Sequence, residues 1–370
     1  MTPSEQWVLQ FCHGYDGPFL DCARQYAALF VGTPYKVCTV YLTGAPSDHV
    51  VAGSASDEVI FLDYSSREVR GLKLRAIRDI RRISRARNFV FCIAHRFKPI
   101  YVALLGTTLP VVGVHHAFGD YQRRSRQLFA SHYRKRLALL GVSNAVRDDL
   151  RACLPNWPAE CIQTLYNRID VAAVQAEQVS REEARAFLRL PQDVWIVGNV
   201  GRLHPDKDQA TLIRGFAQAL PKLPSGSLLA IMGSGKLEDS LKALAIELGV
   251  AESVRFLGQV QRGRCYFKAF DLFALTSDHE PFGMVLLEAM AAGVPVVCSD
   301  CGGGKEVVAS REMLFPLADS EALSSLLVVQ SSLSDIHRCD LISSQSARLQ
   351  QEFSDVVAVR KFWCFYRRIE

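Results

Sequence analysis

The stretch EPFGMVLLEAMAAGVPVV, residues 280–297, contains two glutamates in an otherwise apolar run. A Phe-Gly turn follows Glu280, after which the pattern predicts a buried helix that ends at Gly293 and then a short apolar strand. An ionised carboxylate such as Glu288 is costly among buried apolar side chains unless a partner satisfies it. We therefore expect Glu288 to meet a ligand; the alternative is a glutamate that reaches solvent from the helix face.

This stretch resembles the donor-sugar motif of the retaining family 4 glycosyltransferases, which have the two-domain GT-B fold. The resemblance implies that Glu280 contacts hydroxyls of the transferred sugar and that Glu288 binds the nucleotide ribose. It also implies a diphosphate site at the start of the helix, where unpaired N–H groups and the helix dipole favour an anion. The backbone N–H groups of that site belong to Phe282, Gly283, Met284 and Val285.

A second match lies in GRLHPDKD, residues 201–208, which follows the apolar run 194–200. It resembles the diphosphate clamp of the same family, with Arg202 and Lys207 as the two cations. Preorganised cations stabilise the charge that develops on a leaving nucleoside diphosphate. Solvated loop cations are the alternative for this stretch by itself. Lys207 stands between Asp206 and Asp208, so we do not interpret the aspartates as a metal site, and we predict that no metal or other cofactor is required.

The chain of 370 residues, 49% apolar and 22% charged, is typical of a globular protein with two domains. Apolar runs alternate with helical patterns, which predicts an α/β protein with mostly parallel sheets. With the resemblance, this gives two Rossmann-like domains facing across a cleft: an acceptor-binding domain at 1–175 and a nucleotide-sugar-binding domain at 190–353. The polar piece 170–191 would contain the linker, and the last helix, about 354–370, is expected to pack back on the first domain.

Two positions of the first domain match the family less specifically. Gly17, in the turn after the first predicted strand, matches the last glycine of a loop that lies against donor and acceptor. In the family, a histidine after the strand predicted here at 110–114 lies near the reaction centre. His115 matches it best, and His116 competes for the assignment. Without the resemblance, a hydrogen-bonded loop histidine is the alternative.

Positive charge gathers in the first half, which has 22 Lys+Arg against 14 Asp+Glu in residues 1–170 (+8), whereas residues 171–370 have 21 against 24 (−3). Most of it lies in a helix predicted at about 67–87 and in the run 123–136. Solvated helix faces are one interpretation. The other is attraction to an anionic inner membrane or to a phosphorylated acceptor. Nucleic acid is not a predicted partner, because recognition motifs and interleaved aromatic residues are lacking.

Other features exclude further classes of protein. The eleven cysteines show no framework spacing, and Cys298 and Cys301 lack the partners of a zinc site, so we expect reduced thiols. The run 228–236 superficially resembles a P-loop but lacks its first glycine and its Ser or Thr, which excludes an NTPase. The uncharged stretch 99–119 is interrupted by Gly, Thr and Pro, and the N-terminus has no signal pattern, so we expect a cytoplasmic protein.

The predicted function is a retaining hexosyltransferase that moves a sugar from a nucleoside diphosphate sugar, with a UDP-sugar favoured. The expected acceptor is a hydroxyl of a lipopolysaccharide-core or other cell-envelope glycan or glycolipid. His115, Glu280, Arg202 and Lys207 would form the reaction centre. A nucleotide-sugar epimerase of the same architecture and a non-catalytic nucleotide-binding regulator are the alternatives.

Overall fold

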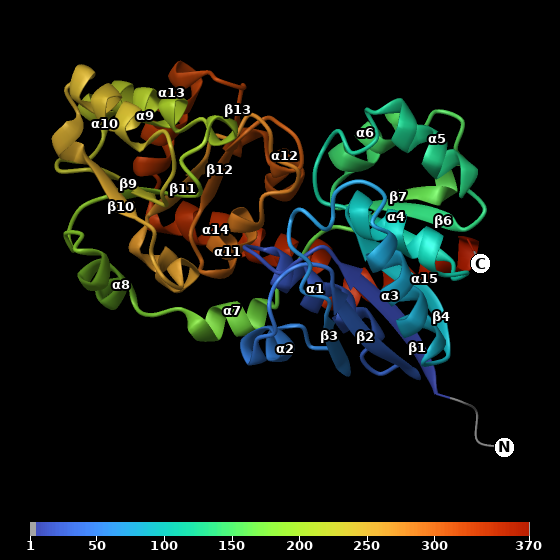
Figure 1. Ribbon diagram of the computed structural model, residues 1–370. Helices are drawn as coiled ribbons and strands as arrows, with labels where there is room; N and C mark the ends of the chain where they lie inside the picture. Colours follow the sequence, from blue (N-terminus) through green and yellow to red (C-terminus); the bar gives the residue numbers. More distant parts are fainter. Residues whose placement is uncertain (1–4, 370) are drawn as a thin grey trace. The chain divides into compact units, whose positions relative to one another are not determined.

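The computed structural model describes residues 5–369 and divides them into two compact units. The first unit comprises the chain up to Asn167 together with the last helix from Asp355, and the second comprises Arg168–Ser354 (Figure 1). Each unit contains one sheet, and all strand pairings within the described residues are parallel. The predicted class, α/β with two Rossmann-like parallel-sheet domains, is confirmed.

The first unit has a seven-stranded sheet in the order β3-β2-β1-β4-β5-β6-β7. The order reverses between β1 and β4, and open parallel sheets bind ligands at such a switch point, beyond the carboxyl ends of the strands. The strands are β1 (Gln6–Cys12), β2 (Tyr35–Tyr41), β3 (Glu58–Phe61), β4 (Phe89–His95), β5 (Val111–His115), β6 (Leu137–Gly141) and β7 (Ile162–Thr164).

Helices connect these strands in the right order for parallel pairing. They are α1 (Phe19–Ala27), α2 (Asp48–Gly53), α3 (Leu74–Arg85), α4 (Phe97–Gly106), α5 (Arg124–His132) and α6 (Asn144–Cys153). The final helix, α15 (Asp355–Ile369), also belongs to this unit. Within residues 5–369, no helix has both the length and the apolar character needed to cross a bilayer.

The second unit repeats the same design with a six-stranded sheet in the order β10-β9-β8-β11-β12-β13. Its switch point lies between β8 and β11. The strands are β8 (Ile196–Val200), β9 (Leu228–Met232), β10 (Val254–Gly258), β11 (Leu272–Leu275), β12 (Val296–Ser299) and β13 (Leu314–Phe315). The helices are α7 (Val171–Glu177), α8 (Arg181–Leu188), α9 (Gln209–Ala219), α10 (Glu238–Glu247), α11 (Met284–Ala291), α12 (Gly304–Val308), α13 (Ser320–Ser331) and α14 (Asp335–Glu352).

The final helix α15 belongs to the first unit by its packing (Figure 1). Its Phe362 is fully buried, with its ring centre 5.8 Å from that of Phe30 and 6.4 Å from that of Phe91. The indole N–H of Trp363 donates to the carbonyl of Leu29 at 3.3 Å. Aromatic burial of this kind contributes strongly to a core, so the last segment of the chain completes the core of the first unit.

The segment predicted to contain a linker is instead ordered structure of the second unit. Residues 170–191 form α7 and α8, and α8 begins with a capping box between Ser180 and Glu183. Arg185 of α8 is fully buried; its guanidinium donates to Asp271 at 2.8 Å and to the carbonyl of Ala269 at 2.9 Å. The linker prediction was wrong because a polar composition does not show that one arginine is buried and satisfied by long-range partners.

Three predicted element bounds also differ. The basic helix is shorter than the predicted 67–87, because Gly71 and Lys73 have positive φ values of 61° and 55° and stop helical continuation before Leu74. The apolar run 137–143 predicts a strand followed by Asn144 as the N-cap of the next helix. The N-cap of α6 is instead Ser143, whose hydroxyl accepts from the N–H of Val146. His115 is the last residue of β5, not the first residue after it.

Candidate active site

The cationic loop after β8 occupies one side of the switch point in the second unit. It contains the 3-10 helix η3 (Pro205–Lys207) and ends at Asp208, which has a φ of 42° and caps α9. The carboxylate of Asp208 accepts from the N–H of Thr211 at 3.2 Å. This cap fixes the end of the loop and therefore the backbone position of the preceding residue, Lys207.

Glycines of the neighbouring loop support the cationic loop through backbone contact. A Cβ added at Gly233 would lie 1.9 Å from the carbonyl oxygen of Gly201, and one at Gly235 would lie 2.3 Å from that of Leu203. The N–H of Leu203 donates to the carbonyl of Ser234 at 3.0 Å. The glycines of the P-loop-like stretch therefore have a structural role, since only residues without Cβ allow this approach.

A second loop, residues 276–280 after β11, lies against the first because β8 and β11 are neighbours in the sheet. The hydroxyl of Thr276 donates to the carbonyl of Lys207 at 3.0 Å, and the N–H of Asp278 donates to the carbonyl of Asp206 at 3.2 Å. These hydrogen bonds fix the register of the two loops and bring their charged side chains together.

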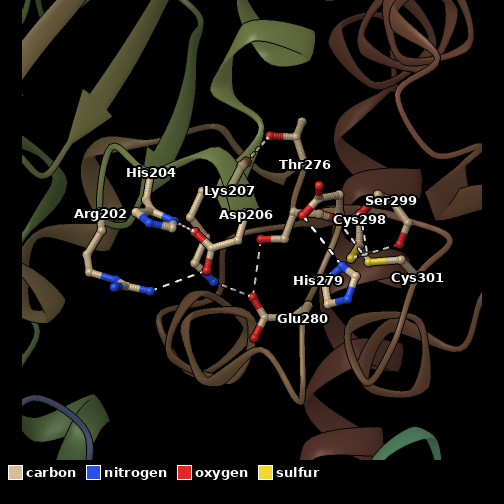
Figure 2. Close-up of polar contacts among 12 residues, drawn as sticks. Arg202, His204, Asp206, Lys207, Thr276, His279, Glu280, Cys298, Ser299 and Cys301 are labelled. Carbon is tan, nitrogen blue, oxygen red and sulfur yellow. Dashed lines mark hydrogen bonds and ion pairs between the residues drawn. The ribbon is translucent and has the colours of Figure 1, made fainter. Parts of the chain in front are cut away.

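Lys207 and Glu280 form an ion pair across the two loops, with 2.7 Å between the ammonium nitrogen and Oε2 (Figure 2). Glu280 is only 7% exposed, and its carboxylate also accepts from the hydroxyl of Ser277 at 3.2 Å. A buried carboxylate needs such donors, because an unpaired charge there is strongly unfavourable. The structure thus fixes one cation and one anion at the carboxyl end of the sheet.

Arg202 lies beside this pair but is held less tightly (Figure 2). Its guanidinium is 3.3 Å from the carboxylate of Asp206, while its side chain is 70% exposed. His204 Nδ1 lies 2.5 Å from the other oxygen of Asp206. An exposed ion pair of this kind contributes little energy, so Arg202 is free to turn toward an incoming anion.

Metal-ligating side chains do not gather in the part of the chain that the structure describes: no group of three or more His, Cys, Asp or Glu residues is placed to hold an ion. Asp206 and Asp208 are both engaged by protein donors. Metal independence stays a prediction.

The predicted anion site at the start of α11 has the expected backbone. Gly283 is the N-cap with a φ of 97°, and Phe282 before it is buried against Phe353 with ring centres 5.8 Å apart. The first-turn N–H groups of Met284 and Val285 follow. A cap without a side-chain oxygen leaves these donors to a ligand or to water.

The second unit also contains Glu288 and the cysteines Cys298 and Cys301. Glu288 lies in the middle of α11 and is half-buried among apolar neighbours. Cys298 and Cys301 are buried, and burial raises the pKa of both thiols, so they stay protonated. Cys301 donates to the carbonyl of Ser277 at 2.8 Å. Cys301 therefore supports the loop that carries Glu280.

In the first unit, His115 ends β5 as a fully buried side chain. Its Nδ1 lies 2.7 Å from a carboxylate oxygen of Asp120, and its Nε2 has no hydrogen-bond partner among the described residues. Burial alone would raise the pKa of Asp120, but the hydrogen bond with His115 and the charges of His115, Arg126 and Arg96 outweigh it and lower that pKa. An ionised Asp120 accepts from Nδ1–H and fixes the orientation of the ring.

His116, the competing assignment, has partners at both ring nitrogens. Nδ1 lies 3.8 Å from the sulfur of Cys22 and Nε2 lies 3.1 Å from Nδ1 of His95. This arrangement favours His115 as the histidine with a nitrogen left for a ligand. Gly17 lies in the exposed turn after β1 with a φ of 59°, a conformation that suits glycine.

Sequence reasoning missed Asp120, Asp206 and Ser277 as partners of the predicted residues. For Asp206 the sequence suggests only a metal ligand, an interpretation that the intervening Lys207 argues against. Asp120 stands five residues after His115, in a loop without periodicity, and no spacing rule indicates that the chain turns back there. Short-range patterns carry no information about such a return, whereas the fold does.

Comparison with known proteins finds glycosyltransferases among the similar sequences and structures. Residues 180–328 match the family model described as glycosyl transferases group 1. An uncharacterized glycosyltransferase of Methanocaldococcus jannaschii is 33% identical over 198 residues, which cover 51% of this chain and 50% of that protein. The lipopolysaccharide core biosynthesis glycosyltransferase LpsE of Rhizobium meliloti is 36% identical over 142 residues, covering 38% of this chain and 40% of LpsE. The chain thus spans about half the length of the curated relatives it matches, or less.

Among solved structures, Anabaena HepE in complex with UDP-glucose superimposes with a TM-score of 0.77 at 20% identity, covering 98% of this chain and 99% of HepE. At this identity the similarity establishes the fold alone. The two Rossmann-like units therefore correspond to the GT-B fold predicted from the sequence.

Proposed function

We propose that the whole protein is a retaining family 4 hexosyltransferase, because residues 180–328 match the family model described as glycosyl transferases group 1. Its donor is a nucleoside diphosphate sugar, with a UDP-sugar favoured. Its acceptor is a hydroxyl of a lipopolysaccharide-core glycan or another glycan or glycolipid of the cell envelope.

The observation that carries the proposal is the Lys207–Glu280 pair at the switch point of the second sheet. A sugar nucleotide presents hydroxyls, which need a hydrogen-bond acceptor, and a diphosphate, which needs cations. The two kinds of group must therefore lie close together in the protein. The carboxylate of Glu280 is the hydrogen-bond acceptor, and Lys207 and the exposed Arg202 are the cations. The start of α11 contributes backbone N–H groups. Glu288, farther along α11, binds the ribose in this proposal.

In the proposed reaction, the acceptor hydroxyl attacks the anomeric carbon from the face that the diphosphate leaves, and a diphosphate oxygen takes the hydroxyl proton. The C–O bond to the diphosphate breaks as the new glycosidic bond forms. Lys207 and Arg202 stabilise the charge on the leaving group, since preorganised cations act most strongly where charge develops. His115 shapes the reaction centre, and no protein carboxylate becomes a nucleophile.

Relatives support the choice of substrates. Anabaena HepE has been crystallised with UDP-glucose, which supports a UDP-sugar donor. LpsE is named as a lipopolysaccharide core enzyme, which supports an envelope glycan acceptor.

The direct test is nucleotide release from a panel of UDP- and GDP-sugars, with lipopolysaccharide-core oligosaccharides as acceptors and mass spectrometry of the products. We expect transfer with retained anomeric configuration, unaffected by EDTA. Conversion of the donor without acceptor would instead identify an epimerase. Tight donor binding without any turnover would identify a regulator.

We also propose peripheral contact with the anionic inner membrane through the outer face of α3. Arg78 and Arg82 of this face have side chains 75% and 82% exposed. Cationic side chains near a bilayer surface attract anionic lipids, an effect that salt weakens. Co-sedimentation with vesicles should therefore require anionic lipid and decline with salt; binding indifferent to both would contradict the proposal.

A further inference from the structure

Three helices of the first unit begin in an unusual way. The N-caps of α3, α4 and α5 are Lys73, Arg96 and Arg123, and the first turns of these helices contain no acidic residue. Helix N-termini normally favour negative charge. Lys73 and Arg96 also have positive φ values of 55° and 73°, a backbone conformation that costs energy in residues other than glycine.

The side chains of this region form a defined cluster on an aromatic platform, which consists of Phe97, Tyr101 and Phe129. The ammonium of Lys73 lies 4.8 Å from the ring centre of Tyr101, and the guanidinium carbon of Arg126 lies 4.5 Å from that of Phe97. Both rings pack on Phe129, with centres 4.9 and 6.0 Å away. The platform holds two cations in place through cation–π contacts.

The cations of this cluster repel one another. The pKa of Lys98 is lowered by burial and then by the charges of Arg96, Arg70 and Arg126. That of Lys73 is lowered by burial and then by the charges of Lys98 and Arg126. Within residues 5–369, neither lysine forms an ion pair with a carboxylate. The cluster is therefore short of negative charge, and an anion placed there would relieve the repulsion.

The cluster is connected to the predicted reaction centre. The guanidinium of Arg126 donates to the backbone carbonyl of Asp120 at 2.8 Å and lies 3.4 Å from its carboxylate, which holds His115. A ligand bound by Arg126 would thus contact the same side chain that contacts Asp120, the partner of His115. A second feature, the exposed Leu72 and Leu74, flanks Lys73.

We propose that Lys73, Lys98 and Arg126 bind a phosphate group, and that this phosphate belongs to the acceptor of the reaction. A phosphate monoester carries up to two negative charges and three acceptor oxygens, which suits three cations that have a single carboxylate, that of Asp120 beside Arg126, among them. Arg126 would bind two oxygens as a planar fork, and the lysines would supply compact charges. The assignment of this phosphate to the acceptor substrate rests on the proposed function. The phosphate site itself does not.

Binding of inorganic phosphate to the full chain tests the site without any donor. We expect saturable binding by isothermal titration at constant ionic strength, weakened at least about fivefold by Lys98→Gln and by Lys73→Gln, because each removes a charge-assisted contact. Lys135→Gln removes an exposed cation of the same unit and should leave the affinity unchanged. Absence of saturable binding, or equal affinities of all three variants and the parent, would overturn the site.

Two sources of phosphate are separated by competition. A soluble hexose phosphate should displace inorganic phosphate, while the neutral hexose should not, and vesicles of phosphatidylglycerol should bind equally to the parent and to Lys98→Gln. If vesicle binding is lost in Lys98→Gln and the hexose phosphate does not compete, the source is a lipid headgroup and the acceptor proposal is wrong. Phosphate binding in a protein without transferase activity would retain the site and refute the proposed function.

Discussion

At the residue scale, Lys207 has two roles: it forms an ion pair with Glu280, and in the proposed reaction it binds the donor diphosphate. The position of its ammonium is fixed for both roles, since hydrogen bonds from Thr276 and Asp278 hold the loops around it. The neighbouring Arg202 is more exposed and is held by a single exposed carboxylate contact. Lys207 is therefore the residue whose loss should matter most.

We expect Lys207→Met to lower kcat/KM for donor turnover by about 100-fold or more, because a preorganised charge at the leaving group is lost. It should also destabilise the second unit by about 1–3 kcal/mol, since the buried Glu280 loses its cationic partner. Steady-state kinetics and urea unfolding measure the two effects. The matched control is Lys222→Met, an exposed lysine in the same unit. Unchanged turnover in Lys207→Met would remove this residue from the mechanism.

Buried histidines give the first unit a pH-dependent stability. Burial lowers the pKa of His95 to about 3, and burial with the charges of His95, His115 and Arg96 lowers that of His116. An unfolded histidine titrates near pH 6.5, so below this pH the unfolded chain binds more protons and stability falls as the pH drops. For one histidine this amounts to about 2 kcal/mol between pH 6.5 and 5.

His95→Gln should therefore show a smaller loss of stability between pH 7 and pH 5 than the parent protein. Urea unfolding at both pH values measures the difference, and His132→Gln, an exposed histidine of the same unit, is the control. A variant with the full decline would show that His95 does not remain neutral in the folded protein.

At the element scale, the start of α11 depends on one glycine. The N-cap Gly283 has a φ of 97°, and a Cβ there would lie 3.0 Å from Cδ1 of Leu286. The turn at Gly249 has a φ of 70° but open space around its Cα. An added Cβ would therefore strain the backbone at both Gly283 and Gly249. Only Gly283 belongs to the proposed donor site.

We expect Gly283→Ala and Gly249→Ala each to destabilise the second unit by about 1–2 kcal/mol, because alanine resists positive φ. Only Gly283→Ala should also raise the KM for the donor, through displaced backbone donors at the helix start. Thermal unfolding and donor titration check the two parts. An equal KM in both variants would argue against an anion site at α11.

At the scale of the whole molecule, the first unit is completed by the end of the chain. Phe362 of α15 is fully buried in that unit, and Phe216 of α9 is fully buried in the second. Each lies in a core of its own, so the loss of either side chain should be felt mainly by one unit.

Phe362→Ala should lower the free energy of unfolding of the first unit, and Phe216→Ala that of the second. Each loss should be about 3–5 kcal/mol, because apolar burial is lost and a cavity is left behind. Differential scanning calorimetry of both variants separates the two transitions. If both variants shifted one common transition, the two units would unfold as one cooperative block.

The sequence by itself determined the α/β class and both charged loops, because these follow from local patterns. Alternating apolar runs specify strands and helices, and the stretch 280–297 carries its own helix start, burial and carboxylates within 18 residues. Boundaries were less well determined: the helix predicted at 67–87 begins at Leu74, and the expected linker at 170–191 folds as α7 and α8.

Only the tertiary structure decided which charges meet. Lys207 and Glu280 lie 73 positions apart, and they pair because the strand order makes β8 and β11 neighbours. His115 finds Asp120 where the chain turns back after β5. Strand order and loop return depend on the packing of the whole sheet, and no short stretch of sequence contains that information.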